Sequence, residues 1–179
     1  MTAIHNIKAN KGSKTPGIDH KIIDKDYLQK DYYEVVTDIQ NSFTNYKPDM
    51  VRRKWIPKPG KQEKRPLGIP TIKDRIVQEC VRLIIEPILE AQFFQHSYGF
   101  RPWRDTHMAL ERVKDQVHRI GYYWIVEGDI SRFFDNVNHT ILIKKLYHMG
   151  IADRRILMII KEMLKAGIMD ECKKNELGT

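Results

Sequence analysis

The strongest local pattern in the sequence is a helical stripe of apolar residues. Thr71 and Asp74 have the spacing of a capping box, which predicts that a helix begins after Thr71. Pro87 is expected to kink this helix or to mark a break near its end. The apolar positions recur at every third or fourth residue, as on one face of an α-helix, and are Ile76, Val77, Cys80, Val81, Ile84, Ile85 and Ile88. Cys80 lies on this stripe, which indicates a small core residue and not a nucleophile.

Weaker patterns predict the other elements. Apolar stripes and capping residues indicate helices over roughly residues 24–46, 104–120, 138–149 and 153–166. Strands are predicted at Val51–Pro57 and Pro66–Thr71, on either side of an exposed hairpin tip. Pro66 and Pro70 favour a sheet edge, because proline cannot donate to a strand ladder. A short hairpin is expected to begin at residue 168, and the predicted fold class is α+β.

Positive charge is concentrated on this hairpin and just after it. The chain has a net charge of +8 and a pI near 9.4, and residues 51–75 alone carry nine basic and two acidic side chains. A clustered basic surface favours a polyanion, most often nucleic acid, although a solvated basic face is the alternative. The candidate nucleic-acid contacts are Lys11 and Lys14 in the polar loop 8–19, Arg101 in the aromatic loop 96–103, and Arg52, Arg53, Lys54, Lys61, Lys64, Lys73 and Arg75. For Arg101 a structural role is an equal alternative.

A candidate catalytic carboxylate follows the apolar run Tyr122–Val126. The run has the β-branched and aromatic residues of a buried strand, and alternation over residues 123–130 would place Glu127 and Asp129 on one face. A carboxylate at the end of such a strand, beside an open turn, can hold a divalent cation. From the local pattern alone, Asp129 is equally well explained as the cap of that turn.

Composition and missing motifs exclude several classes of protein. A chain of 179 residues with 41% hydrophobic residues can bury a core, and its apolar runs are too short to span a bilayer. The two cysteines form no metal motif or disulfide framework and the N-terminus lacks a signal peptide, so a cytoplasmic location without a membrane partner is expected. Phosphate-binding glycine loops and the G-x-S-x-G elbow are missing. The remaining features suit phosphoryl transfer that depends on Mg²⁺.

Four sequence motifs occur in a fixed order along the chain. They are Asn10–Asp19, Ile56–Gln78, Ser97–Pro102 and Glu127–His139. In this order they resemble the N-terminal part of a group II intron-encoded reverse transcriptase, also called an intron maturase. The resemblance covers nearly the whole chain and implies a truncated fingers-and-palm fold, with fingers over residues 1–120 and the first part of the palm over residues 121–179. It implies an RNA-directed DNA polymerase that also binds its group II intron RNA and assists splicing and mobility.

The same resemblance implies how an incoming dNTP would be held. Lys58 and Arg65 correspond to the pair that clamps the triphosphate from the fingers side, and an arginine fork suits phosphate oxygens. Backbone amides of Arg132 and Phe133 would face the triphosphate. Phe134 corresponds to the aromatic residue that rejects a ribose 2′-hydroxyl. The implied partners are therefore dNTP and an RNA template with a DNA primer, beside the intron RNA.

For catalysis, the resemblance implies two Mg²⁺ ions. Asp129 would be the first catalytic aspartate and would bind both ions, with the backbone carbonyl of Ile130 as a further ligand. The family also needs a Tyr-x-Asp-Asp motif, and this sequence contains no adjacent aspartates. The chain is therefore expected to be a fragment that holds no complete metal pair and does not polymerise by itself.

Three alternatives remain open at the level of sequence. A retron- or CRISPR-associated reverse transcriptase has related motifs, although the segment from Asn10 to Asp19 favours the intron type. The chain alone could act as a non-catalytic RNA-binding module. It could also self-associate into a homodimer, since an incomplete palm exposes apolar surface.

Overall fold

Helix α3 (Ile72–Glu90) lies between two hydrophobic cores in the computed structural model, which describes residues 1–60, 62 and 64–170. Its predicted start is confirmed, because the Thr71 hydroxyl accepts a hydrogen bond of 3.2 Å from the backbone N–H of Asp74. Ile72 and Ile76 belong to one core and Val77 and Val81 to the other. The predicted stripe is thus buried on two sides, but only in the first half of the helix, since Ile84 and Ile88 are 55% and 40% exposed.

The first core is built by the N-terminal helices. Helix α1 (Thr2–Ala9), a short π-helical turn η1 (Asp24–Leu28) and helix α2 (Tyr32–Thr44) contribute most of its buried side chains. The single helix predicted for residues 24–46 is wrong, because the chain breaks between η1 and α2. Asp31 begins the new helix there, and its carboxylate accepts hydrogen bonds from the backbone N–H groups of Tyr33 and Glu34. A side-chain cap therefore replaces the continued helical ladder.

The second core joins α3 to two later helices. Helix α5 (His139–His148) and helix α6 (Arg154–Lys165) begin where predicted, after Asn138 and Asp153, and both caps accept hydrogen bonds from backbone N–H groups in the first turn. The buried residues of this core are Tyr46, Val77, Val81, Leu146, Ile151, Ile159 and Ile160. The packing therefore crosses the boundary predicted at residue 120, and that division into two domains stays a prediction.

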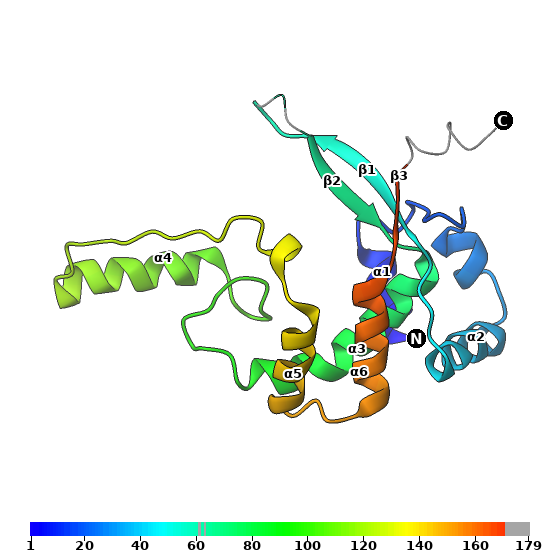
Figure 1. Ribbon diagram of the computed structural model, residues 1–179. Coiled ribbons are helices and arrows are strands. Elements are labelled where there is room, and N and C mark those ends of the chain that lie inside the picture. The colour runs from blue at the N-terminus through cyan, green and yellow to red at the C-terminus, as the bar shows by residue number, and fades with distance from the viewer. Residues whose placement is uncertain (61, 63, 171–179) are drawn as a thin grey trace.

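A small sheet stands at one end of these helices (Figure 1). Strand β1 (Val51–Pro57) is central, with β2 (Lys64–Ile69) antiparallel on one side and β3 (Ile168–Asp170) parallel on the other. The predicted hairpin is confirmed, although β2 covers residues 64–69 in place of the predicted 66–71. Pro66 lies on this edge strand, where its missing N–H is tolerated. Residues 168–170 pair with β1, and the rest of the predicted C-terminal hairpin lies outside the described residues. Helices and a mixed sheet make the chain α+β.

Asp74 ties the base of the hairpin to the helices. The Asp74 side chain is buried and accepts hydrogen bonds from the Tyr46 hydroxyl (2.7 Å), the Thr71 hydroxyl (2.8 Å) and the backbone N–H of Asp49 (3.1 Å). These partners come from the residues after α2, the approach to β1 and the residue before α3. Burial, together with the hydrogen bond to Asp74, raises the pKa of Tyr46 above its ordinary value. The segment that leads into β1 is therefore held by one buried carboxylate.

The segment between α3 and α5 forms an arm that extends from the body (Figure 1). It consists of α4 (Thr106–Asp115), the π-helical turn η2 (Gln116–Ile120), the extended residues 121–130 and the short 3₁₀ turn η3 (Phe134–Asn136). No residue of α4 is buried, so the apolar side predicted for this helix is left uncovered. Among the described helices, none is long and apolar enough to cross a membrane.

The strand predicted at residues 123–130 is wrong. The segment is extended but forms no ladder with any described strand, and Trp124 and Val126 are 93% and 95% exposed. A strand needs a neighbour to accept and donate its backbone hydrogen bonds. The free side of β1 is taken by β3, and residues 121–130 lie on the arm, away from the sheet. The alternation of apolar residues in this segment is therefore not sufficient to form a strand.

Candidate nucleic-acid interface

The β1–β2 hairpin carries the exposed positive charge. It projects beyond the helical body (Figure 1), and Lys54, Lys64 and Arg65 on it are exposed. Arg52, Arg53 and Lys58 are half-buried. The predicted contact Lys61 lies outside the described residues, as does Glu63, which is the only acidic residue in the sequence between positions 51 and 70. The hairpin is therefore a ribbon whose sequence carries a large excess of positive charge.

Strand register divides this ribbon into two faces. Directly opposed residues of an antiparallel pair lie on the same face, and neighbours along a strand alternate. The pairs Lys54↔Leu67 and Ile56↔Arg65 share what we call the clamp face. The pairs Arg53↔Gly68, Trp55↔Pro66 and Pro57↔Lys64 share the opposite face, which we call the Trp55 face. Lys58 lies one residue beyond β1, outside the ladder, so strand register assigns it to neither face.

The polar loop with Lys11 and Lys14 is docked at the base of the hairpin by Arg75. Its guanidinium donates to the backbone carbonyls of Gly12 (3.0 Å), Thr15 (2.7 Å) and Pro70 (3.0 Å). Lys11 and Lys14 are exposed, so they add charge beside the ribbon. Arg75 itself is directed at these carbonyls, which gives it a bracing role, and its contact with nucleic acid stays a prediction.

A direct backbone contact holds the end of the same loop. A Cβ atom on Gly17 would lie 2.6 Å from the Cα and 2.8 Å from the backbone N of Thr71. A side chain does not fit there, so glycine permits the chain to pass against the residue that caps α3. Local sequence patterns predict neither this contact nor the hydrogen bonds of Arg75 to the loop, because both join segments about 60 residues apart.

Two other predicted contacts are engaged within the protein. Lys73 forms an ion pair of 3.0 Å with Asp38 on α2. The Arg101 side chain is 6% exposed and donates to the Glu90 carboxylate and to the carbonyls of Phe94 and Ser97. Its hydrogen bonds lower the pKa of Glu90. The structural role for Arg101 is thus supported, because its hydrogen bonds join the end of α3 to the loop that follows it.

The predicted catalytic stretch lies on the arm and is exposed. Asp129 belongs to the extended segment, and Ile130 and Phe134 are 67% and 86% exposed. Arg132 has a left-handed backbone (φ 49°) in the turn before η3, and its carbonyl accepts from the backbone N–H groups of Asp135 and Asn136. Figure 1 shows this segment well apart from the hairpin tip, so the two halves of the predicted nucleotide site are not brought together.

The residues present do not fit a complete metal centre. Across residues 1–60, 62 and 64–170, no three His, Cys, Asp or Glu side chains gather closely enough to hold a metal ion. Asp129 supplies a single carboxylate, whereas two Mg²⁺ ions need several oxygen ligands. No catalytic step through a metal follows from these residues alone.

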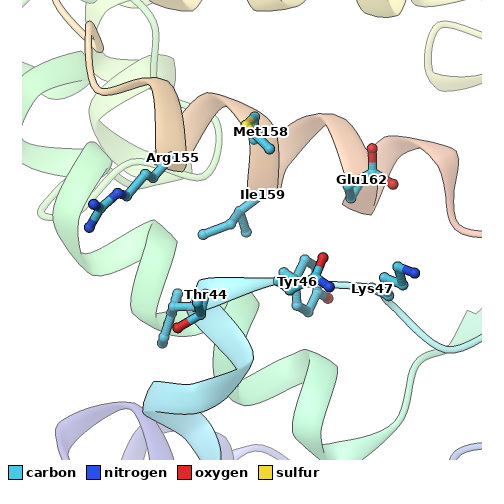
Figure 2. Close-up of a pocket in the computed structure, with 9 residues that line it drawn as sticks. Thr44, Tyr46, Lys47, Arg155, Met158, Ile159 and Glu162 are labelled. Carbon is cyan, nitrogen blue, oxygen red and sulfur yellow. The ribbon is translucent and has the colours of Figure 1, made fainter.

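A cavity of about 300 Å³ lies between helix α6 and the end of α2 with the residues that follow it. Figure 2 shows Thr44, Tyr46 and Lys47 on one side and Arg155, Met158, Ile159 and Glu162 on the other. Glu162 is the one carboxylate among its lining residues. The cavity thus offers a single carboxylate to a metal ion, and it lies beside the helical core and not on the hairpin.

Comparison with known proteins gives consistent matches along the chain. A family model described as reverse transcriptase (RNA-dependent DNA polymerase) matches residues 56–178. The group II intron-encoded protein LtrA of Lactococcus lactis subsp. cremoris is 38% identical over 168 residues, which are 94% of this chain and 27% of LtrA. The protein YkfC of Escherichia coli (strain K12) is 38% identical over 90% of this chain and 43% of its own length. The putative COX1/OXI3 intron 1 protein of Saccharomyces cerevisiae is 32% identical over 96% of this chain and 20% of its own length.

This chain spans less than half the length of each of these relatives. The part that the family model matches begins at Ile56, the sixth residue of β1, and includes β2, α3 and the stretch around Asp129. Because the family model covers well over half of the sequence, the chain belongs to the reverse transcriptase (RNA-dependent DNA polymerase) family.

Proposed function

We propose that this chain is part of an RNA-directed DNA polymerase that also binds its group II intron RNA and assists splicing and mobility. The observation that carries the proposal is the 38% identity to a group II intron-encoded protein over 94% of this chain. A yeast relative that is also named for an intron matches 96% of this chain. This second match favours the intron type over retron- or CRISPR-associated enzymes. The cationic hairpin supplies surface of the charge that RNA binding requires.

In this proposal residues 1–120 are fingers and residues 121–179 are the first part of the palm. Arg65, on the clamp face, and Lys58, one residue beyond β1, bind the triphosphate of an incoming dNTP, because an arginine fork and a lysine ammonium both suit phosphate oxygens. The backbone amides of Arg132 and Phe133 complete this site and Phe134 acts as the sugar gate. The hairpin and the arm lie apart. In this proposal the arm therefore takes a different position in the longer protein, where the triphosphate-binding residues of the hairpin and of the arm come together.

Asp129 and the Ile130 carbonyl are proposed as ligands of the two Mg²⁺ ions in the longer protein. The ions would supply the activation of the attacking oxygen and stabilise the leaving one. The 179-residue chain lacks adjacent aspartates, so we expect it not to extend a DNA primer on an RNA template. A primer-extension assay with the purified chain and Mg²⁺ checks this. Extension that disappears in Asp129→Ala would contradict it.

The chain alone is proposed to bind single-stranded RNA through the hairpin and the loop with Lys11 and Lys14. If about five phosphates are contacted, the logarithm of the binding constant falls with the logarithm of salt concentration at a slope of about −3.5. Replacing Lys54, Lys64 and Arg65 by alanine removes three exposed cations and should make this slope shallower by about 2. Fluorescence anisotropy with labelled RNA over a salt series measures both slopes.

A matched triple variant controls for the loss of total charge. Lys144, Lys145 and Lys161 are also exposed but lie on α5 and α6, in the helical body. Their replacement by alanine should leave the slope nearly unchanged. An equal change of slope in both triple variants would assign the binding to overall charge and not to the hairpin. Self-association through the exposed residues 122–126 remains a separate prediction, and light scattering that shows monomer alone would exclude it.

A further inference from the structure

The Trp55 face carries an exposed aromatic ring. Trp55 lies on β1, directly opposite Pro66 of the edge strand, and is 43% exposed. The guanidinium carbon of Arg53 lies 5.6 Å from the centroid of the ring. A cation over an indole holds the ring in a defined orientation. The hairpin thus presents a large, oriented aromatic surface on the side away from Lys54 and Arg65.

Two cationic residues of the hairpin share this face with the ring, and one acidic residue, Asp170 of β3, is in register with Arg53. Arg53 and Lys64 share the face with Trp55, and the sequence between positions 51 and 70 contains one acidic residue, Glu63. An aromatic ring flanked by cations on a projecting ribbon is the combination that binds single-stranded nucleic acid, because bases stack on the ring while the cations contact phosphates. Duplex RNA does not offer this contact, since its base faces are already stacked on one another.

We propose that the Trp55 face is a second nucleic-acid site, on which an unpaired segment of RNA stacks a base against the indole of Trp55. Arg53 orients the ring, and Lys64 contacts the neighbouring phosphate. The site is distinct from the clamp face. The hairpin would then bind RNA on the Trp55 face and a nucleotide or RNA on the clamp face. This inference rests on the proposed binding of RNA by the chain. It attributes part of the affinity for RNA to the uncharged side chain of Trp55.

The test compares Trp55→Ala with the unchanged chain in binding to single-stranded RNA and to duplex RNA of the same sequence. Removing a stacking ring should weaken single-stranded binding roughly fivefold to a hundredfold at fixed salt, whereas duplex binding stays the same. The salt slope should not change, because no cation is lost. Trp55→Phe should recover most of the affinity, since a phenyl ring can still stack.

Leu67→Ala is the matched control on the same hairpin. Leu67 lies one register position away on the clamp face and is 45% exposed, so its replacement removes a similarly exposed apolar side chain from the other side. It should leave single-stranded binding unchanged. Circular dichroism and thermal unfolding of each variant verify that the hairpin and the cores are intact.

The outcomes separate this inference from the proposed function. Salt-dependent binding of RNA with equal affinities for Trp55→Ala and the unchanged chain would overturn the Trp55 site alone. Equal losses for Trp55→Ala and Leu67→Ala, or an equal loss on duplex RNA, would also overturn it. An unchanged chain that binds no RNA at low salt would overturn the RNA-binding proposal and this inference together.

Discussion

Asp74→Ala is expected to lower the free energy of unfolding by about 4 kcal/mol. The Asp74 side chain is 3% exposed and accepts hydrogen bonds from the hydroxyls of Tyr46 and Thr71 and from the backbone N–H of Asp49. Alanine leaves these donors in a buried site without an acceptor, and hydrogen bonds to a charged group are worth more than neutral ones. Urea denaturation followed by circular dichroism measures the change.

Two variants show whether the buried network, and not the loss of charge, causes this effect. Tyr46→Phe removes one of the hydrogen bonds and should cost about 1–2 kcal/mol. Asp38→Ala removes a carboxylate that is 57% exposed and pairs with Lys73, and should cost less than about 1 kcal/mol. If Asp74→Ala costs no more than Asp38→Ala, the proposed anchoring of the hairpin base by Asp74 is wrong.

Gly17→Ala is expected to destabilise the chain by about 3 kcal/mol or more. The added Cβ atom would lie 2.6 Å from the Cα of Thr71 and 3.0 Å from the carbonyl carbon of Pro70. These are backbone atoms, so no side-chain rotation relieves the overlap and the loop must move off the start of α3. That displacement also strains the bonds from Arg75 to the loop.

Gly12→Ala provides the control in the same loop. A Cβ atom at Gly12 meets nothing within 4 Å, and Gly12 is exposed. Its replacement should be neutral or stabilising by up to about 1 kcal/mol, because alanine restricts the unfolded chain. Thermal unfolding of both variants decides the question, and equal shifts would contradict the close contact at Gly17. Gly17→Ala should also weaken RNA binding, because Lys11 and Lys14 move with the loop.

Elements defined by nearby residues were predicted well. Thr71, Asn138 and Asp153 begin helices by accepting hydrogen bonds from backbone groups two or three residues ahead. The β1–β2 hairpin joins strands close in sequence, and its turn residues and prolines specify both the reversal and the edge position. Such features depend on local geometry, so a single sequence carries enough information for them.

Elements that depend on distant partners were predicted poorly. Tyr122–Val126 has the composition of a buried strand, but strand formation requires a second strand, and β3 occupies the side of β1 that could have received one. The apolar side of α4 likewise has no helix packed on it among the described residues. The periodicity of apolar residues predicts that one face of an element is apolar, but it does not predict which element packs on that face.

The sequence by itself determined the family, the capped helices, the cationic hairpin and the candidate residues Lys58, Arg65 and Asp129. Only the tertiary structure decided which cations are available to a ligand. Arg75 and Arg101 donate to carbonyl or carboxylate groups of the protein, whereas Lys54, Lys64 and Arg65 are exposed. Charge is a property of each residue, but its hydrogen-bond partners depend on the fold. Arg75 donates to carbonyls 60 and 63 residues away in sequence, and Arg101 donates to groups that the loop after α3 brings around it. Alternation along β1 already separates Trp55 from Lys54, and the register of β2 places Arg65 on the face opposite to Trp55.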